Sequence, residues 1–102
     1  MQKSQTILES YEGRMSVARR NYDDPAYREW RKKVYRRDKR RCRMPGCRSR
    51  FKIQAHHIKK WSEAAILRFD VDNGITLCKK CHASINGLES HYETLFSQIV
   101  RG

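Results

Sequence analysis

The sequence predicts a small α+β domain in which two short strands and a helix accompany a four-cysteine metal site, with a further helix on each side. Three observations support this fold class. Two cysteine pairs lie about thirty residues apart, which is typical of zinc-stabilised domains. Two short segments have strand character. Apolar residues recur at helical spacing in two flanking segments. These are, in order, Cys42/Cys47 and Cys78/Cys81, residues 51–58 and 75–77, and residues 24–38 and 88–99.

The cysteine pairs favour a structural Zn²⁺ site. Each pair supplies two thiolates from a tight turn, and four thiolates suit the tetrahedral preference of zinc. The alternatives are two disulfides, or buried thiols that pack as small apolar groups. Zinc is favoured because no secretory signal accompanies the cysteines, and such pairs in a reducing compartment are typically metal ligands. In a chain of 102 residues, zinc would also add folding free energy that a small core cannot supply.

The charge balance predicts a polyanionic partner. The chain has 23 Lys and Arg against 11 Asp and Glu, for a formal net charge of +12. Nucleic acid is favoured over a membrane surface, because no apolar run approaches the length of a membrane span. Residues 1–41 carry thirteen basic and six acidic residues, residues 42–87 nine and three, and residues 88–102 one and two. The first two segments are therefore expected to contact the nucleic acid.

The first part of the chain predicts a helix that follows an amino-terminal helix or arm, residues 1–23. Asp24-Pro25 is a strong helix start, since aspartate caps and proline fits the first turn. The apolar face is Tyr27, Trp30 and Val34. The opposite face is basic and continues into the first cysteine turn, so phosphate contact is expected about as much as a merely solvated face. The DNA-binding residues predicted here are Arg28, Arg31, Lys32, Arg36, Arg37, Arg40 and Arg41.

The second part predicts two strands joined by a long loop and followed by two helices. Residues 51–58 alternate as a strand, with Phe51, Ile53 and Ala55 on one side. Residues 59–72 form the loop, Asn73-Gly74 a turn, and residues 75–77 the second strand. A helix begins near Cys78–Cys81, carries His82 and ends about Asn86-Gly87, and a closing amphipathic helix follows. The loop residues expected against the core are Trp61, Ile66, Leu67 and Phe69.

Three histidines in this second part predict a second, catalytic metal site. Adjacent strand residues point in opposite directions, so His56 and His57 can take different roles. His56 and His82 can each give one imidazole nitrogen to an ion, leaving the open coordination positions of a catalytic metal. His57, beside a ligand but free of the metal, can act as general base. Each histidine alone is more often a hydrogen-bonded structural residue, so the prediction rests on their joint arrangement.

These motifs resemble the HNH endonucleases, which have a ββα-metal fold. The resemblance extends from about Asp38 to His82 and includes the order of the cysteine pairs, His56-His57-Ile58, Asn73-Gly74 and Cys81-His82. It implies a nuclease domain over residues 24–102, with its metal-supported core at about residues 38–87. It implies that His57 activates water, that Asn73 braces the loop that aims His57, and that His56 and His82 hold a divalent ion. Cleavage of DNA to 5′-phosphate and 3′-hydroxyl ends would follow.

Many members of this family have aspartate where this chain has His56. Two neutral imidazoles predict that Mn²⁺, Co²⁺ or Ni²⁺ supports cleavage at lower concentration than Mg²⁺, which prefers oxygen ligands. By analogy with small phage-encoded members, we expect action in the bacterial cytoplasm, with a phage terminase or packaging protein as a possible partner. We also expect a monomer, and no membrane contact because no apolar run approaches the length of a span. Two alternatives remain: a catalytically inactive zinc-stabilised nucleic-acid-binding module or regulator, and a structural adaptor protein that binds a larger partner.

Overall fold

The computed structural model describes residues 23–102, and the expected arm over residues 1–23 lies almost entirely outside this range. Helix α1, Pro25–Arg37, begins where the sequence predicts: Asp24 caps it by accepting a hydrogen bond from the Ala26 amide at 2.8 Å. The buried residues of α1 are Tyr27, Trp30 and Val34, which confirms the predicted apolar face. No helix of the described residues is long and apolar enough to span a membrane.

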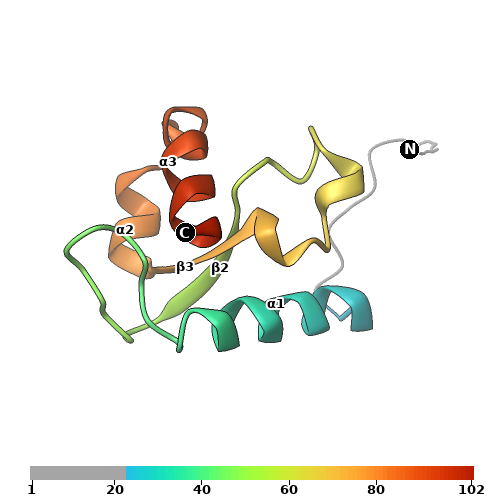
Figure 1. Ribbon diagram of the computed structural model, residues 1–102, viewed down its shortest axis with the longest axis horizontal. Coiled ribbons are helices and arrows are strands. Elements are labelled where there is room, and N and C mark those ends of the chain that lie inside the picture. Colours follow the sequence, from blue (N-terminus) through green and yellow to red (C-terminus); the bar gives the residue numbers. More distant parts are fainter. Residues whose placement is uncertain (1–22) are drawn as a thin grey trace, which may run out of the picture.

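A two-stranded antiparallel hairpin forms the centre of the domain (Figure 1). Strand β2, Ile53–His57, pairs with β3, Gly74–Cys78, in a register that places His57 opposite Gly74. The hairpin lies between α1 on one side and two carboxy-terminal helices on the other. These are α2, Lys79–Ser84, and α3, Glu89–Arg101. The predicted α+β class, with a hairpin followed by a helix and flanked by helices at both ends, is confirmed.

The period of two along the strands separates the interior into two apolar clusters. On one side, Ile75 and Leu77 pack with Ile85 and Phe96 of the carboxy-terminal half. On the other, Tyr27, Trp30 and Val34 pack with Ala55, Trp61 and Val71. Helix α1 approaches so closely that a Cβ at Gly74 would lie 2.5 Å from Val34 Cγ2 and 2.6 Å from Trp30 Cζ2. Gly74 is therefore required by the packing of α1 on β3.

Asp38, directly after α1, joins four parts of the chain. Its buried carboxylate accepts hydrogen bonds from Arg37, from Arg43 and, at 2.9 Å, from the Thr76 amide. Arg43 also donates to the Ile99 carbonyl in α3 at 3.1 Å. Burial raises the pKa of Asp38, but the hydrogen bonds from Arg37 and Thr76 outweigh it and hold the pKa below its usual range. The ionised carboxylate thus ties α1, the first cysteine loop, β3 and α3 together.

Two apolar segments differ from the sequence-based expectation. The first strand begins at Ile53 rather than at residue 51, because Lys52 has a positive φ of 50° and interrupts the alternation, so Phe51 is 71% exposed. In the loop, Ile66 is 91% and Phe69 44% exposed, so the expected burial of these two side chains is wrong. The short helical turn Ala65–Leu67 directs Ile66 outward, and Trp61 and Val71 supply the loop's contacts with the α1 cluster.

Candidate active site and structural metal centre

The four cysteines converge into one cluster. Cys42 and Cys47 come from the loop after α1, Cys78 ends β3, and Cys81 lies in α2; their sulfur atoms all lie within 4.8 Å of one another. The Sγ atoms of Cys47 and Cys78 are 3.8 Å apart. Two thiolates bound to one tetrahedral zinc at about 2.3 Å would have their sulfurs about 3.8 Å apart, whereas a disulfide bond measures about 2.0 Å. The cluster therefore fits the predicted structural zinc.

Local backbone geometry brings the cysteines together and favours the thiolate form of Cys78. Gly46 has a φ of +83°, the left-handed conformation that allows the turn between Cys42 and Cys47. Cys78 caps α2, and the Cys81 amide donates to its sulfur at 3.4 Å. This backbone hydrogen bond lowers the pKa of Cys78 to about 7, while burial raises the pKa of Cys42 and of Cys81. A bound divalent cation would stabilise the remaining thiolates.

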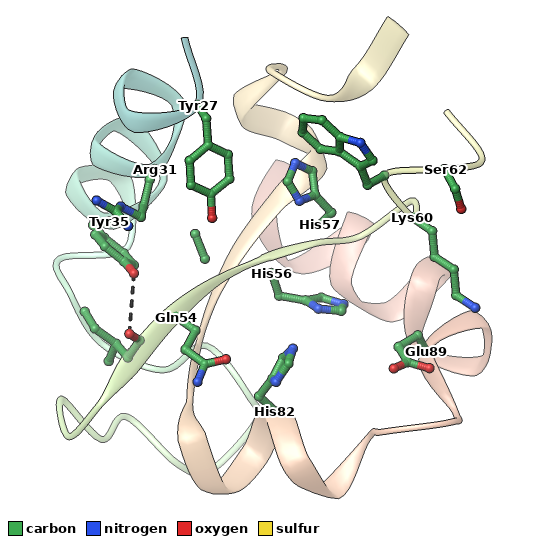
Figure 2. Close-up of a pocket in the computed structure, with 13 residues that line it drawn as sticks. Tyr27, Arg31, Tyr35, Gln54, His56, His57, Lys60, Ser62, His82 and Glu89 are labelled. Atoms are coloured by element: carbon green, nitrogen blue, oxygen red, sulfur yellow. Dashed lines mark hydrogen bonds between the residues drawn. The ribbon is translucent and has the colours of Figure 1, made fainter. Parts of the chain in front are cut away.

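A groove of about 880 Å³ contains the three predicted histidines (Figure 2). All five residues of strand β2 line the groove. His56 and His57 therefore both reach it, although their side chains project from opposite faces of the strand. Helix α1 forms one wall, and α2 with the start of α3 forms the other. The residues that line it are Tyr27, Arg31, Tyr35, Ile53, Gln54, Ala55, His56, His57, Lys60, Trp61, Ser62, His82 and Glu89.

His56 and His82 form a pair on the carboxy-terminal side of the groove. Their ring centroids are 5.4 Å apart with the planes at 68°, and His56 also makes an edge contact with Phe96. Two imidazoles that share one ion, with metal–nitrogen distances of about 2.1 Å, have centroids roughly 5 Å apart. The donor set and spacing of His56 and His82 therefore fit a shared divalent ion.

His57 lies on the other side of β2, against α1. Its ring stacks on that of Trp30, with centroids 4.0 Å apart and planes at 10°, and Trp61 contacts it edge-on at 5.5 Å. His57 Nε2–H donates to the Arg68 carbonyl oxygen at 2.9 Å. Since a carbonyl only accepts, the neutral imidazole carries its lone pair on Nδ1. Stacking and the hydrogen bond thus fix both the ring plane and the tautomer.

Asn73, which precedes β3, braces the loop that supplies the Arg68 carbonyl. Its Oδ1 accepts from the Lys59 amide at 2.8 Å, and its Nδ2 donates to the carbonyls of Lys59 and Leu67, both at 3.2 Å. These three bonds connect the beginning of the loop, at Lys59, and its short helical turn, at Leu67, to the start of β3. Asn73 thus holds Leu67, the neighbour of Arg68, and the Arg68 carbonyl in turn bonds to His57.

The predicted DNA-binding residues fall into different environments. Arg31 lines the groove, and Arg28 and Lys32 are exposed on the neighbouring surface of α1. Arg36 follows the buried Val34 by two positions, about 200° around the helix, and so faces away from the core. The guanidinium of Arg37 is held by hydrogen bonds within the domain. Besides its bonds to Asp38, it donates to the carbonyls of Val71 at 2.7 Å and Gly74 at 2.6 Å.

The last two predicted residues flank the cysteine loop. The guanidinium of Arg40 lies over the Tyr35 ring, 5.0 Å from its centroid, and Arg41 donates to the Arg48 carbonyl at 3.3 Å. The loop adds exposed cations that sequence reasoning did not select, at Arg48, Arg50 and Lys52. The sequence signal that could have identified these cations is the absence of acidic residues between Arg40 and Lys52.

Sequence reasoning also missed Lys60 and Glu89, which line the groove beside the histidines. Glu89 lies seven residues beyond His82 in the sequence, in a separate helix. No spacing rule linked it to the histidines, so only the turn between α2 and α3 reveals that it belongs to the site.

The hairpin, the helix that follows it and the cysteine cluster define an α+β domain with a four-cysteine cluster suited to a metal ion and three histidines in one groove. Residues 42–87 match the family model of the HNH endonucleases. The chain thus contains an HNH endonuclease domain at residues 42–87, which confirms the resemblance noted in the sequence. Comparisons with curated proteins and with solved structures give no significant match.

Proposed function

We propose that this protein is a metal-dependent endonuclease that hydrolyses DNA phosphodiester bonds. The observation that carries the proposal is the arrangement around β2. His57 lines the groove from one side of the strand, and the His56–His82 pair lines it from the other. A proton acceptor and a cation site that share one groove are the two parts that phosphodiester hydrolysis needs.

In this mechanism His57 accepts a proton at Nδ1 from the water that attacks phosphorus. Nδ1 is buried in the structure, so the side chains around it must move to admit that water. Nε2 stays on the Arg68 carbonyl, so the imidazolium formed by proton transfer keeps a hydrogen-bond acceptor. Stacking on Trp30 supports the charged ring through cation–π attraction. His56 and His82 would hold the divalent ion, which, when bound, supplies Lewis-acid stabilisation of charge on the phosphate and the leaving 3′ oxygen.

The function is tested by supercoiled-plasmid nicking. Protein loaded with one equivalent of zinc should nick plasmid only when Mg²⁺, Mn²⁺, Co²⁺ or Ni²⁺ is added. His82→Ala should lose nicking at low ion concentration and regain part of it at high concentration, because one ligand remains. Dialysis rather than a strong chelator should remove the catalytic ion, so that the structural zinc stays bound.

His91→Ala is the matched control, since His91 is exposed on α3 and does not line the groove. It should nick like the parent. Tight DNA binding without nicking under every ion would instead favour the inactive zinc-stabilised binding module. Equal nicking with no added ion would refute the role of the histidine pair.

We propose that DNA lies along the groove side of α1. Arg31→Gln with Lys32→Gln should weaken binding by about tenfold and reduce the slope of log affinity against log salt by about 1 to 2. The control Lys33→Gln with Arg36→Gln removes the same charge from the same helix, but neither residue lines the groove. It should have a clearly smaller effect in a salt titration. Equal losses for both pairs would show that only the net charge of the helix matters.

A further inference from the structure

Glu89 shares the groove with the histidine pair. Helix α2, which carries His82, ends at Ser84, and α3 begins at Glu89. Gly87, with a φ of +85°, reverses the chain between the two helices. The turn therefore brings a carboxylate to the wall that also carries His82, and Figure 2 shows His56, His82 and Glu89 projecting from three different elements into this groove.

The Glu89 carboxylate is ionised, and the hydrogen bond that it accepts from the protein occupies only part of its acceptor capacity. Its Oε1 accepts the Gly87 amide at 3.0 Å. The amide of Glu89 itself has the largest effect in lowering the pKa of this carboxyl, and the charges of Lys60 and His56 act in the same direction. An ionised carboxylate has about four lone-pair sites, so the contact with Gly87 leaves acceptor capacity for a cation. Among the described residues, only the four cysteines already bring three or more metal-ligand atoms within 4.8 Å of one another, so Glu89 reaches the histidines only after its side chain turns.

We propose that Glu89 supplies a carboxylate oxygen to the divalent ion held by His56 and His82, which makes a site of two histidines and one carboxylate. This inference rests on the proposed function, because it assigns a third ligand to the same ion. A glutamate has three rotatable side-chain bonds, so its carboxylate can turn from the Gly87 amide towards the histidines without any change in the backbone.

The third ligand changes the expected choice of ion. Two neutral imidazoles alone favour Mn²⁺, Co²⁺ or Ni²⁺, whereas a carboxylate adds negative charge and the hard oxygen that Mg²⁺ prefers. With Glu89 as the third ligand, Mg²⁺ and Mn²⁺ should both bind at the site and support cleavage. Loss of the carboxylate should therefore penalise Mg²⁺ more than Ni²⁺.

Glu89→Gln tests the proposal, because its amide oxygen can still accept the Gly87 hydrogen bond. Binding of Mn²⁺ to the zinc-loaded protein, followed by electron paramagnetic resonance without DNA, gives a readout independent of cleavage. We expect Glu89→Gln to raise the Mn²⁺ dissociation constant by about tenfold or more, in the range typical when a metal site loses a supporting carboxylate. The nicking rate should fall further with Mg²⁺ than with Ni²⁺.

Glu93→Gln is the matched control. Glu93 lies one turn further along α3 and pairs with Lys59 at 2.8 Å rather than lining the groove. It should bind Mn²⁺ like the parent. If Glu89→Gln also binds like the parent while His82→Ala does not, the proposal is overturned and the histidine site stands. A parent that binds no Mn²⁺ overturns both. Glu89→Asp, with the carboxylate kept on a shorter stem, should bind between parent and Glu89→Gln, and the melting temperature of each variant confirms folding.

Discussion

His57→Ala is expected to lower the single-turnover nicking rate by about two to four orders of magnitude, the usual contribution of a general base. The alanine side chain cannot accept a proton from water. Affinity for DNA should stay within about twofold of the parent, because binding depends on Lys and Arg contacts to phosphate. Nicking of plasmid under saturating protein, together with a gel-shift titration in the absence of the divalent ion, separates the two effects.

The position of His57 requires a control for folding. His57 is 5% exposed and its ring stacks on Trp30, so alanine leaves a gap beside the indole. His57→Gln places an amide nitrogen near the position of Nε2, where it can donate to the Arg68 carbonyl, and it fills more of this space, yet its side chain is not basic. Both variants should be inactive, and the glutamine variant should melt closer to the parent. Activity of His57→Gln within a fewfold of the parent would disprove the role of His57 as base.

Removal of zinc is expected to unfold the domain. Structural zinc binding is worth about 10–16 kcal/mol in small zinc domains, which equals or exceeds the roughly 5–15 kcal/mol by which a typical domain is stable. Cys42 and Cys78 also belong to the same buried cluster as Ile75, Leu77 and Phe96, so repulsion or solvation of the thiolates would open the core. Far-UV circular dichroism should lose its helical signal after complete chelation and recover it when one equivalent of zinc is returned.

Cys81→Ser provides a graded version of this experiment, since it weakens one ligand of the cluster and leaves the core residues in place. It should lower the zinc affinity and the melting temperature. His82→Ala, which alters the adjacent residue in α2 without touching the cluster, should retain about one zinc per chain by metal analysis. A zinc-free protein with an unchanged spectrum and melting temperature would rule out a structural zinc.

Local sequence patterns predicted the helices, the two strands and the four-cysteine cluster, apart from the start of the first strand. Asp24-Pro25 fixed the start of α1, because a capping carboxylate and a proline suit the first turn and act within a few residues. The cysteine spacing indicated a four-thiolate cluster, which the structure assembles from two turns. Alternation along residues 53–57 was enough to send His56 and His57 to opposite sides of the strand.

Tertiary structure decided which side chains share a site and which charges remain available. Arg37 and Arg36 look alike in the sequence, but the position of Arg37 over Asp38 and the carbonyls of Val71 and Gly74 makes it part of the fold. Ile66 is apolar like a core residue, yet the short helical turn leaves it exposed, because Trp61 and Val71 make the loop's contacts with the α1 cluster. Sequence patterns report interactions over a few residues, whereas these outcomes depend on contacts between distant segments. The sequence alone therefore indicated the four-cysteine cluster, the two strands and the helices, and only the packing of α3 beside α2 placed Glu89 in the same groove as the histidines.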